Sequence, residues 1–184
     1  SSLPKYAPVL SRFSPIANTF GRSPLARALA DKILGLSAKR PLPIWHSVLR
    51  QKQDVCVGSG DLGDVVLFAD TFNRYFEPDN LSAAIEVLTA AGFKVHQPVA
   101  ADGEARPLCC GRTYLSTGMV DKARAEANRT IKAFKPYLQK KIPILGLEPS
   151  CLFTFKDEFL SLIDDDVAPV LAKSAMLLEE FLAG

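Results

Sequence analysis

The alternation of short apolar strands with helices is the feature that most constrains the fold of this chain. The uninterrupted run Val65-Val66-Leu67-Phe68-Ala69 is typical of a strand buried on both faces of a sheet. A helical pattern follows over residues 79–91, Gly92 ends it, and a second strand is predicted over residues 94–98. Because a strand, helix and strand in succession form a βαβ unit, we expect an α/β fold: a mainly parallel sheet with covering helices.

The same alternation continues toward the C-terminus. The pattern predicts a helix over residues 120–138, with an interruption near Pro136 as the alternative, and a third strand over residues 144–147. A further helix is expected to start near Ser150, and a final helix is expected over residues 168–181. Functional groups in such a fold are expected in the loops that follow the strands.

The N-terminal part of the chain is expected to be a separate helical segment. Apolar residues recur at helical spacing over residues 6–36, with a break at residues 21–24. Within this break, Ser23 followed by Pro24 is typical of a helix N-cap and first helical residue, so we expect two helices.

The domain organisation follows from these patterns. Residues 1–37 form the predicted N-terminal helical segment, and residues 38–63, rich in Pro and Gly and without a sustained period, are interpreted as a linker or lid. Residues 64–184 form the predicted α/β domain. The chain of 184 residues begins without Met, so we expect a fragment of a longer protein, with a cleaved tag as the alternative.

Net charge and the length of the apolar runs argue against several classes of partner and location. The formal net charge of +2 gives no general electrostatic reason to expect nucleic acid or an anionic membrane surface as partner. The apolar runs are too short for a transmembrane segment, and the first residues lack a signal-peptide pattern. We therefore expect a cytoplasmic protein.

The four cysteines are too few and too unevenly spaced for a secreted disulfide framework. Cys109 and Cys110 are adjacent and cannot easily pair with each other. Cys56 lies in the glycine-rich segment before the first strand, and Cys151 follows the third strand. Reduced thiols or metal ligation are therefore predicted.

Five residues with metal-ligating side chains follow the three strands. Asp70 follows the first strand, Cys109 and Cys110 follow the second, and Glu148 and Cys151 follow the third. Because the carboxyl ends of parallel strands meet at one edge of a sheet, these side chains are expected to converge. Thiolates suit iron or zinc, and a carboxylate can occupy a fourth position. Packing of the cysteines in the core is the alternative.

Cys151 is expected in the first turn of a helix. The helix dipole at that position is expected to favour the thiolate over the thiol.

Three sequence blocks carry a family resemblance: LFADTFNRYFEPDNLSAAIEVLTAAGFKV, LCCGRTYLSTGMVDKARAEANRTIKAF and IPILGLEPSCLFTFKDE. In order and spacing, over residues 64–163, they resemble the cysteine-rich CCG domain of heterodisulfide reductase B subunits, glycolate oxidase iron–sulfur subunits and anaerobic glycerol-3-phosphate dehydrogenase C subunits. The DTF and EPSC forms resemble the C-terminal end of FAD-linked oxidases such as D-2-hydroxyglutarate and D-lactate dehydrogenases.

The chain departs from the full family pattern at two positions. The pattern has a cysteine where this chain has Asp70, and a CxxC where it has Glu148 and Cys151. An iron–sulfur cluster of the heterodisulfide reductase type would therefore lose two ligands. A single iron or zinc ion held by Cys109, Cys110, Cys151 and either carboxylate is the other predicted cofactor, and a structural relic is the alternative.

Motifs for the remaining cofactors are missing from this stretch of sequence. There is no CxxCxxC run, and no GxGxxG follows the first strand. We expect FAD and any ferredoxin-like clusters in the rest of a longer protein. No residue of this chain is predicted to be catalytic or to bind flavin, and the fragment alone is expected to be inactive.

The resemblance implies the C-terminal cysteine-rich module of a flavin and iron–sulfur oxidoreductase that oxidises a D-2-hydroxy acid. Its role would be electron transfer, metal binding or structural, and its partners would be the flavin and ferredoxin-like domains of the same polypeptide. A non-catalytic interaction domain with vestigial cysteines is the alternative. A thiol redox sensor that uses Cys109 and Cys151 is a third interpretation.

Overall fold

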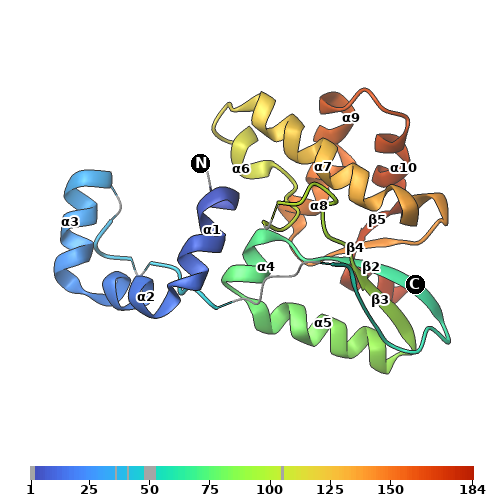
Figure 1. Cartoon of the computed structure of the whole chain (residues 1–184), viewed down its shortest axis with the longest axis horizontal. Coiled ribbons are helices and arrows are strands. Elements are labelled where there is room, and N and C mark those ends of the chain that lie inside the picture. Colours follow the sequence, from blue (N-terminus) through green and yellow to red (C-terminus); the bar gives the residue numbers. More distant parts are fainter. Residues whose placement is uncertain (1–2, 36, 41, 48–52, 105) are drawn as a thin grey trace.

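A five-stranded sheet forms the centre of the described part of the protein, in the order β1-β3-β2-β4-β5 (Figure 1). The computed structural model describes residues 3–35, 37–40, 42–47, 53–104 and 106–184. The strands are β1 (Val55–Val57), β2 (Gly63–Phe68), β3 (Phe93–Gln97), β4 (Ile144–Gly146) and β5 (Ala175–Leu177). Strands β2 to β5 pair in parallel with their neighbours, and β1 is antiparallel to β3. The predicted α/β fold with a mainly parallel sheet is confirmed.

Helices cover both faces of the sheet, which is why β2 is apolar at successive positions. Val65 and Leu67 are buried on one face, and Val66 and Phe68 are buried on the other. The first face packs against α5 (Pro78–Ala90) and α11 (Leu178–Ala183). The helices on the second face are α7 (Val120–Gln139), α8 (Pro149–Lys156), α9 (Glu158–Leu162) and α10 (Val167–Ser174). Figure 1 shows α5 and α7 on opposite sides of the strands.

Aromatic side chains form the centre of the second face. The ring of Phe68 lies 5.9 Å from that of Phe134 and 5.0 Å from that of Phe155, both in edge-to-face geometry. Such pairs contribute about 0.5–1.5 kcal/mol each beyond the area they bury. Cys110 and Cys151 belong to the same buried cluster. The thiols therefore lie against the apolar core.

The final predicted helix, residues 168–181, is wrong as a single element. Helix α10 ends at Ser174, residues 175–177 form β5, and α11 begins at Leu178. Ala175 pairs with Ile144 of β4. Three residues of the predicted helix therefore form a strand at the edge of the sheet. A strand of three residues is too short to show its own period, and pairing with a neighbouring strand decides its conformation.

Helix α7 continues past Pro136 to Gln139. Pro136 lies in the last turn of α7, where it removes the backbone hydrogen bond that residue 136 would donate to residue 132. Strand β1 lies within the segment interpreted as a linker or lid, where no strand was predicted. All three residues of β1 are exposed. The strand therefore lacks the alternation of buried apolar and exposed polar residues by which a half-buried strand is predicted from sequence.

The N-terminal segment contains three helices where two were predicted: α1 (Leu3–Arg12), α2 (Ser14–Arg22) and α3 (Pro24–Leu34). The additional break falls at Phe13. The predicted cap is present, because Ser23 Oγ accepts a hydrogen bond from the backbone N–H of Ala26 at 3.4 Å. Helix α1 packs against α4 (Thr71–Tyr75), as Figure 1 also shows. No helix in the described ranges is long and apolar enough to cross a bilayer.

Candidate functional site

Two of the predicted site residues are in direct contact. The sulfur atoms of Cys110 and Cys151, which are 41 residues apart in the sequence, lie 3.0 Å from each other. Cys109 is adjacent, and its sulfur accepts the backbone N–H of Gly111 at 3.4 Å. All three cysteines are buried and none forms a disulfide. The structure therefore brings together thiols from the loop after β3 and from the first turn of α8.

Gly111 explains how the loop of Cys109 and Cys110 lies against α7. Its backbone is in the left-handed region with φ of 81°, and a Cβ atom there would lie 3.0 Å from the carbonyl oxygen of Ala123. Gly111 is also the N-cap of the short helix α6 (Arg112–Leu115). The absence of a side chain at residue 111 thus allows the backbone of this loop to lie close to α7. This contact sets the position of the neighbouring Cys109 and Cys110.

The two predicted carboxylate ligands are helix caps. Asp70, fully buried, is the N-cap of α4, and its Oδ1 accepts the N–H groups of Phe72 at 2.8 Å and Asn73 at 3.0 Å. Its Oδ2 accepts the side-chain amide of Asn73 at 2.6 Å. Glu148 is the N-cap of α8, and its Oε1 accepts the hydroxyl of Ser150 at 2.7 Å. Both carboxylates therefore already position the helices that follow β2 and β4.

Burial makes the site unfavourable for negative charge. The hydrogen bond with Cys110 and burial raise the pKa of Cys109 well above its ordinary value. For Cys110, the hydrogen bond with Cys109 lowers the pKa, but the contact with Cys151 and burial outweigh it and raise the pKa well above the ordinary value. Burial also raises the pKa of Asp70, although the hydrogen bonds from Asn73 oppose this. The thiols are therefore neutral at physiological pH.

The expectation that the helix dipole favours a Cys151 thiolate is wrong for this arrangement. The hydrogen bond with Cys110 lowers the pKa of Cys151, but burial and the nearby Asp70, Cys109 and Glu148 raise it, and the net pKa is above the ordinary value. A helix dipole contributes about 0.3–1 kcal/mol at an exposed terminus. Burial beside other acidic groups exceeds that contribution here.

The donor set does not match the predicted metal as it stands. Among the residues that the structure describes, no group of three or more His, Cys, Asp or Glu side chains is arranged to hold a metal ion. Both oxygens of Asp70 already accept hydrogen bonds. A metal would therefore require movement of side chains. Ligation by Cys109, Cys110, Cys151, Glu148 and Asp70 stays a prediction.

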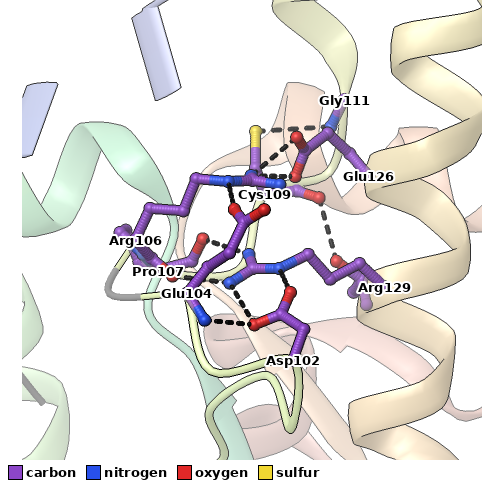
Figure 2. Close-up of polar contacts among 9 residues, drawn as sticks. Asp102, Glu104, Arg106, Pro107, Cys109, Gly111, Glu126 and Arg129 are labelled. Carbon is purple, nitrogen blue, oxygen red and sulfur yellow. Dashed lines mark hydrogen bonds and ion pairs between the residues drawn. The ribbon is translucent and has the colours of Figure 1, made fainter. Parts of the chain in front are cut away.

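Polar side chains of α7 hold the loop that leads to Cys109 (Figure 2). Thr130 donates its hydroxyl hydrogen bond to the carbonyl of Cys109 at 2.9 Å. Arg129 donates to the carbonyls of Pro107 at 2.6 Å and Arg106 at 2.7 Å. Two adjacent residues of α7 therefore hold three backbone carbonyls of the loop, those of Arg106, Pro107 and Cys109.

A buried ion pair completes this attachment. Arg106 donates from Nη1 to both carboxylate oxygens of Glu126 at 2.6 Å, and only 4% of the Glu126 side chain is exposed. Arg106 also pairs with Glu104, and Arg129 pairs with Asp102. The sequence interpretation missed this network, although polar residues on the buried face of an amphipathic helix were a signal for it.

Two further polar side chains, Arg112 and His96, lie beside carboxylates. Arg112 pairs with Glu158, and His96 Nε2 lies 3.0 Å from Asp64 Oδ1. Cys56 is exposed on β1, opposite His96 on β3. The cysteine outside the buried group therefore lies on an edge strand.

Comparisons with known proteins find similarity between this chain and segments of dehydrogenases. It is 27% identical over 162 residues to the C subunit of the anaerobic glycerol-3-phosphate dehydrogenase of Escherichia coli K12, covering 86% of this chain and 39% of the relative. The corresponding protein of Escherichia coli O157:H7 gives the same values. The chain is 21% identical over 174 residues to D-2-hydroxyglutarate dehydrogenase of Escherichia coli K12, covering 86% of this chain and 16% of the relative.

The chain thus spans well under half the length of these curated relatives. No protein-family profile and no solved structure matches it. The relatives are dehydrogenases or subunits of them, which supports an oxidoreductase module and is consistent with the predicted CCG-type domain.

Proposed function

We propose that this chain is the cysteine-rich module of a larger flavin and iron–sulfur dehydrogenase that oxidises a D-2-hydroxy acid, and that its buried thiols take part in electron transfer. The observation that carries the proposal is the 3.0 Å contact between the sulfur atoms of Cys110 and Cys151 at the carboxyl edge of the sheet. Similarity to segments of two dehydrogenases supports a role as part of a larger oxidoreductase. The substrate and the flavin would be bound by other parts of the longer protein.

The thiol contact favours dithiol chemistry as the form of this role. Oxidation of Cys110 and Cys151 forms one S–S bond and releases two protons and two electrons, and the electrons would reduce a partner disulfide to two thiols. Because burial raises the pKa of both thiols, the protons stay on sulfur until the oxidant arrives. In the predicted metal form, a single iron or zinc ion would instead hold the thiols as thiolates.

The experiment uses the full-length enzyme. Cys110→Ser and Cys151→Ser should leave reduction of the flavin by a D-2-hydroxy acid intact but slow electron delivery to an acceptor dye by about tenfold or more, whereas the exposed control Cys56→Ser should change neither. Unchanged delivery in both buried variants contradicts the proposal.

Metal analysis and thiol titration distinguish the dithiol form of the site from the metal-bound form. Stoichiometric iron or zinc that is lost in Cys109→Ser supports metal ligation, and a metal-free protein with a reversible disulfide supports the dithiol form.

A second candidate function, a non-catalytic interaction domain, is favoured by the N-terminal helices. Seven large apolar side chains of this helical segment are each more than half exposed: Val9, Phe13, Ile16, Phe20, Leu25, Leu29 and Ile33. Exposed apolar groups gathered on one segment are typical of a protein interface. Ile16→Asp with Leu25→Asp should then weaken association with the flavin part of the enzyme while leaving thiol titration unchanged.

A further inference from the structure

We propose that Cys56 is a site of reversible exchange with low-molecular-weight disulfides, and that His96 is the base that removes its thiol proton. Cys56 is the middle residue of β1, and the antiparallel register places it directly opposite His96 of β3. The side chains of two directly opposed residues lie on the same face of a sheet, with their Cβ atoms about 4.5–5.5 Å apart. A thiol and an imidazole are therefore neighbours at this edge of the sheet.

A carboxylate of the neighbouring strand β2 orients the imidazole. Asp64 Oδ1 lies 3.0 Å from His96 Nε2, and only 18% of the His96 side chain is exposed. Because an ionised carboxylate only accepts hydrogen bonds, the neutral ring carries its hydrogen on Nε2 and has Nδ1 as its acceptor. A nucleophile beside a base that a third group orients is the arrangement that activates thiols in proteins.

Tyr137 of α7 packs against the same histidine. Its ring lies 5.3 Å from the ring of His96, and its hydroxyl donates to Asp54 Oδ2 at 3.1 Å. Burial, the charge and hydrogen bond of Asp54 and, to a smaller extent, Cys56 raise the pKa of Tyr137 to about 12. The influence of Cys56 on Tyr137 agrees with a thiol that lies on the α7 face of the sheet, as His96 does.

The titratable groups that face His96 come from three elements. They are Cys56 of β1 with Asp54 before it, Asp64 of β2 and Tyr137 of α7. Asp54 already accepts hydrogen bonds from a backbone N–H and from Tyr137, and Tyr137 keeps its proton at neutral pH. Among these groups, His96 is therefore the one that can take the proton of Cys56.

The exchange forms one S–S bond and breaks another. The proton of Cys56 passes to Nδ1 of His96, and the thiolate attacks one sulfur of the small disulfide. The other half of the disulfide leaves as a thiolate, which takes up a proton, so the small disulfide is the oxidant and excess free thiol reverses the step. Because Cys56 is exposed on an edge strand, the reagent reaches it from solution without a binding pocket.

The rate of mixed-disulfide formation tests this assignment. The whole chain is treated with hydroxyethyl disulfide, an uncharged probe, and Cys56 is followed by peptide mass spectrometry. At pH 7, His96→Gln should slow the reaction by about tenfold or more, because a positioned base contributes at least that factor. Asp64→Asn should slow it less, because the base stays but its charged partner is lost. The matched control His46→Gln, which replaces the other histidine of the chain, should react as the unchanged protein does.

The effect of His96→Gln should disappear at pH 10, where a cysteine thiol ionises without a base. Equal rates at pH 7 would overturn the proposal, and so would a difference that persists at pH 10, because it would indicate altered access to the thiol. Dimers linked through Cys56 as the main product would also overturn it, since a second copy would then be the partner. Circular dichroism must show the same fold for every variant, and Asp64→Asn decides if His96→Gln unfolds. Cys110→Ser should leave the rate at Cys56 unchanged, so failure of the electron-transfer proposal is distinguishable.

Discussion

Replacing Glu126 by glutamine should lower the free energy of unfolding by about 3 kcal/mol. The Glu126 side chain is only 4% exposed and its partner Arg106 17% exposed. Removing one partner of a buried ion pair costs about 3–5 kcal/mol, because the other charge stays buried without compensation. The lower end applies here because Arg106 keeps its second partner Glu104, whose side chain is 55% exposed.

Urea unfolding followed by circular dichroism measures this difference. The matched control is Asp121→Asn on the same helix, where Asp121 lies 3.3 Å from Arg124 and its side chain is 99% exposed. That pair should contribute no more than about 0.5 kcal/mol. If Glu126→Gln and Asp121→Asn lose equal stability, the reasoning that burial gives the Glu126 pair its weight is refuted.

The same variant has a consequence at the thiols. Because Glu126 holds Arg106, and the loop from Arg106 leads to Cys109, Glu126→Gln should also increase the alkylation rate of Cys109. Replacing the pair by Arg106→Met with Glu126→Leu should recover most of the stability, because the uncompensated charge is then gone. An unchanged rate in the destabilised variant would show that the ion pair does not control access to the thiol.

Three further predictions concern the exposed thiol, the cap of α4 and the ion pair of Asp102 with Arg129. At pH 7.5, iodoacetamide should modify Cys56 at least about tenfold faster than the three buried cysteines, as measured by peptide mass spectrometry. Asp70→Ala should cost about 1–2 kcal/mol through loss of the α4 cap, whereas Asp70→Asn, which retains an acceptor and removes a buried charge, should cost less than half as much in urea unfolding. The Arg129 hydrogen bond lowers the pKa of Asp102, so its stabilisation is present above about pH 4 and is lost as pH falls further; the stability difference between the protein and Asp102→Asn should shrink between pH 6 and pH 3.

The sequence by itself determined the elements whose signals are local. The apolar run from Val65, the helix that ends before Gly92 and the strand after it correspond to β2, α5 and β3 within about one or two residues. The Ser23 cap was also predictable, since a hydroxyl before a proline satisfies N–H groups within its own turn. Periodicity and capping depend on neighbouring residues, so they can be read without the fold.

The parallel order also made the loop positions of the site predictable, though not the contacts within it. Topology places the residues that follow β2, β3 and β4 at one edge of the sheet. Which sulfur atoms meet depends on the direction of each side chain, and in the structure Cys110 contacts Cys151 while Cys109 accepts the N–H of Gly111.

Only the tertiary structure decided the roles of the remaining groups. Residues 175–177 became β5 because the free edge of β4 supplied hydrogen-bond partners, against a helical pattern in the sequence. Asp70 and Glu148 became caps because the helices that start beside them present unpaired N–H groups. The charge state of Cys151 was decided in the same way: its position in the helix favoured a thiolate, but burial beside other acidic groups, which no local pattern records, raised its pKa.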